Sequence, residues 1–591
     1  MTRHARRVGR GTTFVTVLAL ASCVGVAVAV PAPPALGSTA SRPTRPTVAP
    51  FPLEPIGATP QPSDGRIPNP ATPGGRPLNA HRRCAVTFDT TIGATVGAVN
   101  QWITAHQRRL AHPTTICLAG TFRAPLRVAS KTSTALLMIT HAPGRTAVIE
   151  LGTVTPRDVA PHQYWPVAAA ISIVDSRDVA IIGLRVRDVL YNGPGQTPAG
   201  IDVTARAAAT TTTRTAVPYR SACVAHHGTC GNIYLLDNIV TDVANLADAH
   251  PTRSTCGNPD VGAYGIVVID AGRAGSPPLQ HVVVEGNTIE DLRTGQSESL
   301  SIDGNVVNYL IAHNVLRGLD NIGIDVAGWE AGPVQPRDGL ITNNRVANVD
   351  TLTNSAYASW DPASERCVSL GENAGGIYDD GAARLWIRDN VVWNTNQGIS
   401  LDVETPGRST SDLRVTGNVV VDSRGTSPGD PSEGPNPPGV PGRSAVAGHA
   451  YDALYLDTYG RGSSMRDVVV AHNVFVNQSQ NFQGHAVAPV IDLAGNWRDV
   501  VIEHNVIGGD GAHDRLNPLV VLETPIAGRA LIMDYNCYRG LSAVVGTDFE
   551  NFATPTTTAL SLRAWRASTR DRLDAHSAVG RVASWCATRH P

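Results

Sequence analysis

Lysine is almost absent from this chain of 591 residues, since Lys131 is the only one and arginine supplies every other fixed positive charge. A lysine side chain is therefore a poor choice as the base of any reaction. No segment matches a phosphate-binding glycine loop, a dinucleotide-binding fingerprint or the HExxH motif. The sequence thus contains no motif that indicates nucleotide-dependent chemistry or a zinc protease.

The chain also lacks a surplus of either charge. Its 48 basic and 50 acidic residues give a net charge of −2. A nucleic-acid partner is usually met by a basic field, so we exclude that class. No apolar run of membrane-spanning length follows the first thirty residues.

Residues 1–30 read as a secretory signal peptide. Four arginines precede an apolar run from Phe14 to Val30, and Ala27-Val28-Ala29 is a possible cleavage site. An alternative is a lipoprotein signal, because Leu20 to Cys23 resembles a lipobox and would leave a lipid anchor on Cys23. The residues after Cys23 stay apolar, which favours the first interpretation. Either way, we expect a secreted or cell-surface protein.

Residues 31–80 contain 14 of the 42 prolines, interspersed with Gly, Ser and Thr. Such a segment buries too little apolar surface to fold, and it is predicted to be a disordered linker.

Beyond Cys23, eight cysteines remain, without CxxC spacing. An even, dispersed set favours disulfide bonds in an oxidising compartment over zinc binding. The sequence does not fix the pairing. The favoured pairs are Cys84 with Cys117, Cys223 with Cys230, Cys256 with Cys367, and Cys537 with Cys586.

One short unit recurs along the chain, marked by an asparagine between two strand-like segments in which apolar and polar residues alternate. Successive markers are 49, 27, 30, 46, 28, 55, 32 and 31 residues apart, so most repeats take about thirty. This period predicts a β-solenoid in which the asparagines stack and hydrogen-bond from coil to coil. The markers are Asn238, Asn287, Asn314, Asn344, Asn390, Asn418, Asn473, Asn505 and Asn536.

The frame LWIRDNVVWNTNQGISL, together with VVVEGNTIEDL, LRVTGNVVVDS, VVVAHNVFVNQ and VVIEHNVIGG, resembles the right-handed parallel β-helix proteins of the pectin-lyase-like superfamily. The resemblance implies an all-β fold and leaves the reaction open, because hydrolases, lyases, epimerases, esterases and binding proteins share it. We expect the β-helix domain over residues 84–545, with an N-terminal capping helix within 91–107, and a C-terminal cap over 546–591. A monomer is expected.

Three long repeats place their extra residues after the asparagine turn, over about 242–262, 350–374 and 422–450. Insertions at one coil position project from one face. We therefore expect long loops beside a groove, and a disulfide between Cys256 and Cys367 would join two of them across about 14 Å, or three coil rises.

The strands that follow these insertions predict a catalytic column. If the Ile of each Gly-Ile pair is buried, the residues at +2 and +4 from the Gly face outward. Asp380, Asp402 and Asp457 then stack at +4, with Asp325 at +2. Paired carboxyl groups at this spacing suit glycoside hydrolysis, because crowding raises the pKa of at least one. We expect Asp380 and Asp402 to be catalytic, flanked by Asp325 and Asp457.

Residues around this column are expected to bind a carbohydrate substrate. No cofactor is required. The alternatives are a polysaccharide lyase or uronate epimerase using Ca²⁺ and an arginine base, and a non-catalytic glycan-binding surface protein. Gly-His-Gly and Arg-x-Lys motifs of polygalacturonases do not follow Asp379-Asp380, so pectin is a doubtful substrate. The expected substrate contacts are Glu404, Asp379, Tyr378, Tyr455, Trp329, Arg408 and Arg461.

Overall fold

The computed structural model describes eighteen segments between residues 83 and 580. They are 83–155, 167–192, 197–205, 222–258, 261–272, 275–329, 332–351, 353–362, 364–369, 375–421, 452–458, 461–477, 489–509, 519–522, 530–539, 545–547, 558–569 and 573–580. The predicted signal peptide, linker, third insertion and Cys586 lie outside them.

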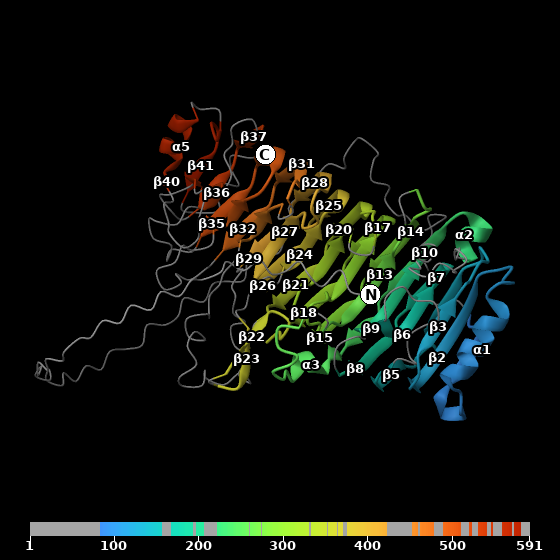
Figure 1. Ribbon diagram of the computed structural model, residues 1–591. Coiled ribbons are helices and arrows are strands. Elements are labelled where there is room, and N and C mark those ends of the chain that lie inside the picture. Colours follow the sequence, from blue (N-terminus) through green and yellow to red (C-terminus); the bar gives the residue numbers. More distant parts are fainter. Residues whose placement is uncertain are drawn as a thin grey trace, which may run out of the picture. The chain divides into compact units, whose positions relative to one another are not determined.

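The described chain is a right-handed parallel β-helix, as the sequence pattern predicts. Each coil contributes one strand to sheet A, one or two to sheet B and one to sheet C, and the strands of successive coils pair in parallel. The exception is the last strand of sheet C, β40 (Thr558–Leu560), which pairs antiparallel with β39 (Val545–Thr547). Figure 1 shows these strands stacked in chain order, from β2 beside α1 to β36 near the other end.

Sheet A is built from strands that precede the asparagine turns. They are β1 (Val86–Asp89), β2 (Thr114–Phe122), β4 (Leu137–His141), β7 (Arg177–Ile182), β10 (Cys230–Leu236), β14 (Leu279–Glu285), β17 (Val306–Ala312), β20 (Arg337–Thr342), β25 (Ala383–Arg388), β28 (Ser409–Thr416), β31 (Ser464–Ala471), β34 (Trp497–Glu503) and β37 (Leu531–Asp534).

Sheet B follows the turns, and β2 continues into it. Its strands are β5 (Ala147–Thr153), β8 (Arg185–Tyr191), β11 (Ile239–Thr241), β12 (Val243–Asn245), β15 (Thr288–Leu292), β18 (Val315–Leu319), β21 (Arg345–Val349), β26 (Val391–Thr395), β29 (Val419–Val421), β32 (Val474–Asn477), β35 (Val506–Gly509), β38 (Cys537–Arg539) and β41 (Ala578–Gly580).

Sheet C carries the predicted site. Its strands are β3 (Leu126–Ala129), β6 (Val167–Val174), β9 (Thr197–Ala205), β13 (Tyr264–Asp270), β16 (Leu300–Gly304), β19 (Ile324–Ala327), β24 (Gly375–Asp380), β27 (Gln397–Asp402), β30 (Leu454–Leu456), β33 (Ile491–Leu493), β36 (Val520–Leu522), β39 (Val545–Thr547) and β40 (Thr558–Leu560).

The asparagine ladder between sheets A and B is confirmed. The side-chain oxygen of Asn390 accepts from the backbone N–H and the side-chain amide of Asn344, at 2.9 and 3.0 Å. Asn390 in turn donates to Ile341 O and to Asn418 Oδ1, each at 3.0 Å. The same pattern repeats from Asn238 to Asn536, and all nine residues are buried. Each rung thus satisfies buried polar groups of two coils.

A helix caps the first coil. The helix α1 (Val96–His106) begins at Thr95, whose hydroxyl accepts from Ala98 N at 3.3 Å. Its buried residues, Val96, Val99 and Ile103, belong to the same apolar core as the first strands. This placement covers the open end of the stack, and the predicted N-terminal cap is confirmed.

At the other end, α5 (Leu562–Ser568) buries Leu562 and Trp565, and β41 extends sheet B beside β38. The segment predicted as a separate C-terminal cap therefore contributes a further strand to the stack as well as a helix. The short elements η1 (Thr90–Ile92) and α2 (Ala222–His227) complete the described helices together with α3 (Leu246–Ala249).

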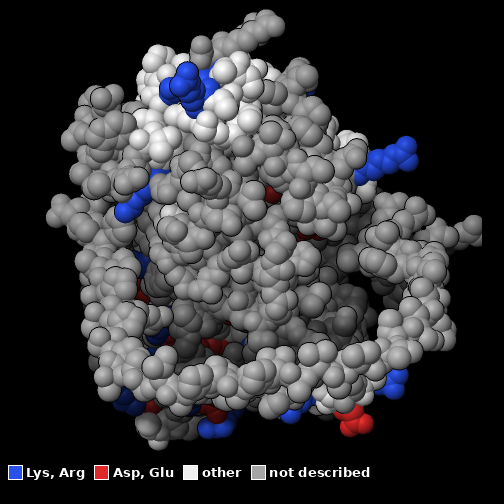
Figure 2. All heavy atoms as spheres, turned by 90° about the vertical axis from the view of Figure 1, so that its left-hand side faces the viewer, with Lys and Arg blue, Asp and Glu red and all other residues white. Residues whose placement is uncertain are grey.

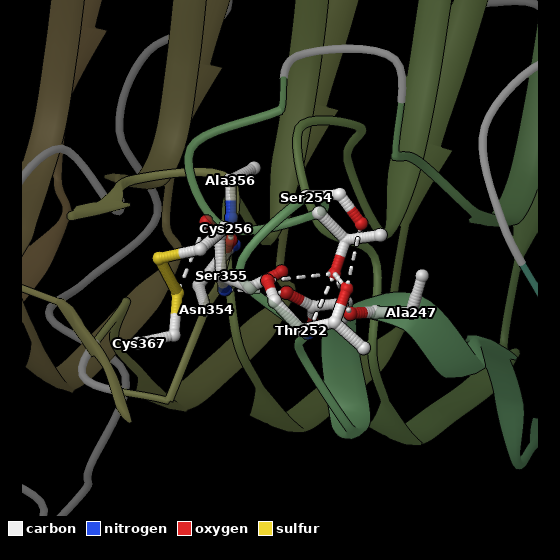
Figure 3. Close-up of a disulfide and its surroundings, with 10 residues drawn as sticks. Ala247, Thr252, Ser254, Cys256, Asn354, Ser355, Ala356 and Cys367 are labelled. Atoms are coloured by element: carbon white, nitrogen blue, oxygen red, sulfur yellow. Dashed lines mark hydrogen bonds between the residues drawn. A yellow bond between two sulfur atoms is a disulfide. The ribbon is translucent and has the colours of Figure 1, made fainter. Parts of the chain in front are cut away.

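The first two insertions both lie between sheet B and sheet C. One contains α3, and the other contains an antiparallel hairpin of β22 (Ala358–Asp361) and β23 (Arg366–Ser369). Figure 3 shows the disulfide between Cys256 and Cys367 that joins them. Beside it, Gly257 N donates to Ser355 O at 2.7 Å. The predicted bridge between these two loops is therefore confirmed.

The disulfides Cys84–Cys117 and Cys223–Cys230 also match the favoured pairs. Cys537 is disulfide-bonded as well, while its expected partner Cys586 lies outside the described residues. Such bonds favour an extracellular location.

Among the helices that the structure describes, none is long and apolar enough to cross a membrane. In the view of Figure 2, basic and acidic side chains of the described residues lie scattered and partly intermixed.

Candidate functional site

Sheet C has the register that the sequence predicts. Ile324, Ile377, Ile399 and Leu454 are successive partners along the stack, and all four are fully buried in the core. Side chains alternate along a strand, so the residues at +2 and +4 from the glycine of each Gly-Ile pair, or from its equivalent, lie on the other face of the sheet. Two columns of polar side chains result.

The first column consists of Asp380, Asp402 and Asp457, and we name it the carboxylate column. Asp380 and Asp402 are direct partners of β24 and β27. Asp457 lies beside Asp402 in the next coil, because Asp457 N donates to Leu401 O at 3.0 Å and Val403 N donates to Asp457 O at 3.2 Å. Neighbouring members are therefore one strand spacing apart, about 4.8 Å.

The second column, the hydroxyl column, consists of Tyr378, Ser400 and Tyr455, which are partners in the same register. Two of its members donate to a carboxylate on their own strand. Ser400 Oγ lies 2.6 Å from Asp402 Oδ2, and the Tyr455 hydroxyl lies 2.9 Å from Asp457 Oδ2. The Tyr378 hydroxyl instead donates to Glu404 Oε1 at 2.6 Å. These bonds fix the orientation of the acidic side chains.

The carboxylate column is buried, where the sequence argument expected side chains facing an open groove. Asp402 is 1% exposed, Asp380 is 4% exposed and Asp457 is 9% exposed. Burial raises the pKa of Asp402 well above its usual value, and the nearby Asp457 and Glu404 raise it further. Burial also raises the pKa of Asp457. Burial thus favours the protonated form of Asp402, and the hydrogen bond from Ser400 acts in the opposite direction.

Two further details bear on reactivity. Asp402 Oδ1 has no hydrogen-bond partner within the described part of the chain, although Oδ2 accepts from Ser400. Asp380 Oδ1 accepts from Glu404 N at 2.9 Å, which fixes this carboxyl group against the loop after β27. Glu404 itself is exposed. The column therefore borders solvent at the edge where Glu404 and the half-buried Tyr378 lie.

Asp325 and Asp379 do not join the carboxylate column. Asp325 belongs to the second column, as partner of Tyr378. Asp379 stands in the inward column, as partner of Val326 and Leu401, and is fully buried. Its side chain faces the core because it is one residue out of phase with Tyr378 and Asp380. Asp379 was expected to contact substrate, but its side chain faces the core instead.

The polar core around Asp379 was missed from the sequence. Asp379 Oδ1 accepts from Ala382 N at 2.7 Å, Oδ2 has no partner among the residues described, and burial raises the pKa of this carboxyl group well above its usual value. The pKa of Tyr309, on the inward side of β17, is also raised by burial and then by Asp379. The bond to Ala382 N braces the turn that follows Asp380.

Two of the expected rim residues, Trp329 and Arg408, line a hollow of about 630 Å³ next to the column. Arg337 and Arg384 line it as well, and neither was identified from the sequence. The expected contact Arg461 is exposed and is absent from the described lining, and its carbonyl accepts from Gly407 N at 3.1 Å. The signal for the two missed arginines would have been their position at the starts of the sheet A strands β20 and β25, which follow the turns from sheet C.

Among the described residues, no group of three or more His, Cys, Asp and Glu side chains is arranged to hold a metal ion. A role for Ca²⁺ therefore stays a prediction.

Fold and site together define a parallel β-helix protein with a buried column of carboxyl groups beside an arginine-lined hollow. No protein-family model matches the chain. The uncharacterized protein YwoF of Bacillus subtilis (strain 168) is 29% identical over 253 residues, which cover 43% of this chain and 44% of that protein. The chain thus matches less than half the length of this relative.

Several solved structures are similar at low identity. The GH136 lacto-N-biosidase of Eubacterium ramulus is 13% identical, with a TM-score of 0.43 over 77% of this chain and 64% of its own. The A-module of the mannuronan C-5 epimerase AlgE6 of Azotobacter vinelandii is 11% identical, with a TM-score of 0.40 over 83% and 98%. A tailspike protein of E. coli bacteriophage HK620 is 10% identical, with a TM-score of 0.44 over 82% and 62%. At these scores the likenesses carry no argument about the reaction.

Proposed function

We propose that the protein is an extracellular glycoside hydrolase in which Asp402 and Asp380 act as a pair. The observation that carries this proposal is the in-register pairing of the buried Asp402, whose pKa is raised by burial, with Asp380 one strand spacing away. Glycoside hydrolysis needs one carboxylic acid to protonate the leaving oxygen and a second carboxyl group to act as base or nucleophile.

Asp402 suits the role of general acid. It is buried, burial raises its pKa, and its Oδ1 has no hydrogen-bond partner among the described residues. The Ser400 hydroxyl holds the other oxygen, so the acid presents one oxygen in a fixed direction. A carboxyl group with a raised pKa is suited to donate a proton as a general acid.

Asp380 suits the role of nucleophile. Its spacing of about 4.8 Å from Asp402 is close to the ~5 Å of retaining enzymes and too short for the water molecule of an inverting one. The bond from Glu404 N orients the Asp380 carboxyl group through Oδ1. Asp457 and Asp325 would orient sugar hydroxyl groups from the two sides.

A screen on plant, algal and bacterial glycans tests the proposal, following reducing ends and the absorbance of unsaturated uronates together, with and without chelator. We expect new reducing ends without that absorbance. Asp402→Asn and Asp380→Asn should each lower kcat by about 10²–10⁴-fold, because an amide keeps the shape but neither donates the proton nor forms the glycosyl ester. Activity of the unmodified protein should fall as pH rises through the pKa of Asp402.

Asp467→Asn is the matched control, because Asp467 lies on sheet A and its side chain is 41% exposed. It should retain full activity. Unsaturated products would support a lyase in place of the hydrolase. Binding of a glycan without turnover, unchanged by Asp402→Asn, would support the non-catalytic alternative. Full activity of both column variants on the substrate found would rule out this assignment of the site.

A further inference from the structure

The hollow beside the carboxylate column is built mainly by turns that lead from sheet C to sheet A. Its lining includes Trp329 after β19, Arg337 and Arg384 near the starts of β20 and β25, and Arg408 before β28. Its volume of about 630 Å³ lies within the usual range of small-molecule sites. We name it the arginine hollow.

Of the three arginines that line the arginine hollow, only Arg384 forms an ion pair with a described residue. Arg384 is neutralised by Asp338, with N–O distances of 2.5 and 2.7 Å. Arg337 donates to Asn305 Oδ1 at 3.0 Å and to Gln335 O at 3.2 Å, but it forms no ion pair with a described residue. Partial burial lowers its pKa and the nearby Arg384 lowers it further, while the carboxyl groups of Asp338 and Asp270 raise it. A partly buried guanidinium group without an ion pair gains from an anion that enters from outside.

Arg408 has no ion pair among the described residues either. Its guanidinium group lies over the Trp329 ring, 5.8 Å from the ring centre. Trp329 therefore offers a flat apolar surface edged by a cation, an arrangement that suits the face of a sugar with a charged substituent. Two guanidinium groups, from Arg337 and Arg408, remain available for that substituent.

The hollow is placed next to the proposed catalytic pair. Trp329 packs on Gly381, the residue after Asp380, so closely that a Cβ atom there would lie 2.3 Å from the indole ring. On the other side, Arg408 follows Glu404, whose N–H holds the Asp380 carboxyl group. The turn at Gly381 and the short loop from Glu404 to Arg408 thus connect the hollow to Asp380.

Two lining residues adopt a backbone conformation that bulky residues rarely adopt. Trp329 has φ 69° and Arg384 has φ 50°. Neighbouring coils have aspartate at the position of Arg384, with φ 59° at Asp338 and φ 60° at Asp412. Left-handed backbone is costlier for large side chains than for aspartate. An arginine at this position of the coil is therefore a local departure from the repeat, and it lies at the wall of the hollow.

We propose that the arginine hollow is a subsite for an anionic sugar residue. Arg337 and Arg408 bind its carboxylate, sulfate or phosphate group, while Trp329 packs on its ring. Guanidinium groups match the geometry of such oxyanions. The proposal rests on the proposed function, since it places a charged sugar next to the bond that Asp380 and Asp402 act on. It narrows the substrate to an anionic saccharide.

Binding to the Asp402→Asn protein tests the subsite without turnover. The probes are uronic-acid oligosaccharides with their carboxyl-reduced counterparts, and sulfated oligosaccharides with their desulfated counterparts, measured by calorimetry at low and high salt. We expect the charged member of one pair to bind at least about tenfold more tightly, with an advantage that shrinks as salt rises. The pair that shows the difference identifies the anion.

Arg408→Ala in the same background should remove about ten- to a hundredfold of the affinity for the charged probe and leave the neutral counterpart nearly unchanged. Arg498→Ala is the matched control, because it removes the same charge from a side chain that is 64% exposed on β34. Circular dichroism checks that each variant folds. Equal binding of charged and neutral probes would overturn the proposal, as would equal effects of the two arginine variants.

The outcomes separate this inference from the proposed function. Arginine-dependent binding of a charged probe that the unmodified protein never cleaves supports the subsite and rejects the hydrolase. Turnover of a neutral glycan that needs Asp402 but not Arg408 supports the hydrolase and rejects the subsite.

Discussion

At the scale of single residues, several buried aspartates on sheet C couple folding to pH. Asp202 is fully buried, and burial raises its pKa to about 7, while the Thr204 hydroxyl donates to it at 2.7 Å. The unfolded chain ionises this group near pH 4. Between these two values the folded state holds a proton that the unfolded state has lost. The contribution of Asp202 to stability is therefore fully present below about pH 4 and is lost as the pH rises toward 7.

Asp202→Asn should remove this contribution. Between about pH 4 and 7, the unmodified protein should lose stability more steeply than the variant, by roughly 1.4 kcal/mol per pH unit. Denaturant unfolding at several pH values measures the two slopes. Asp188→Asn, at a side chain that is 43% exposed, is the control and should leave the slope unchanged. Parallel slopes for Asp202→Asn and the unmodified protein would contradict the assignment.

At the scale of the single element, the asparagine ladder makes the turn between sheets A and B specific. Asn390→Ala would leave Asn344 N and Ile341 O without their buried partners. Each unsatisfied group costs about 1–3 kcal/mol, so we expect a loss of about 2–5 kcal/mol in the free energy of unfolding. Chemical denaturation measures it.

The neighbouring position supplies the control. Asn343 is exposed and has φ 55°, so Asn343→Gly keeps the turn conformation and should change stability by less than about 0.5 kcal/mol. Similar losses at the two positions would show that the turn, and not the ladder, carries the stability.

The disulfide between the two insertions is a second feature that stabilises individual elements of the fold. Cys256 and Cys367 are separated by 111 residues, and Cys223 and Cys230 by 7. By loop-closure entropy alone, the long bridge contributes about 5 kcal/mol and the short one about 2.5 kcal/mol. Replacing Cys256 and Cys367 by serine should thus lower the unfolding temperature more than the same change in the short pair. Thermal unfolding compares them, and an equal or reversed order would argue against the entropic account.

For the molecule as a whole, the repeat made the fold predictable. The spacing of the asparagine markers and the Gly-Ile pairs placed Asp380 beside Asp402 in the correct register, because a period-two strand fixes which side chains share a face. Burial of that column was not predictable in the same way, since it depends on what packs over the sheet. The arginine hollow gathers residues from 275 to 408 across the turns from sheet C to sheet A, and these turns differ in length from coil to coil and carry no repeated marker like the asparagines.

The stack also depends on its ends, because a parallel β-helix has an unpaired edge at each end that invites association with other chains. The first edge is covered by α1, whose Val99 and Ile103 are fully buried against the first strands. Val99→Asp places a charge in this contact and should cost at least about 2 kcal/mol. The helix would then detach and expose strand edge over an apolar core. We expect a lower unfolding temperature and concentration-dependent aggregation by light scattering, whereas Ala105→Asp on the exposed face of α1 should remain monodisperse. If Val99→Asp stays as soluble and as stable as Ala105→Asp, the helix does not protect this end.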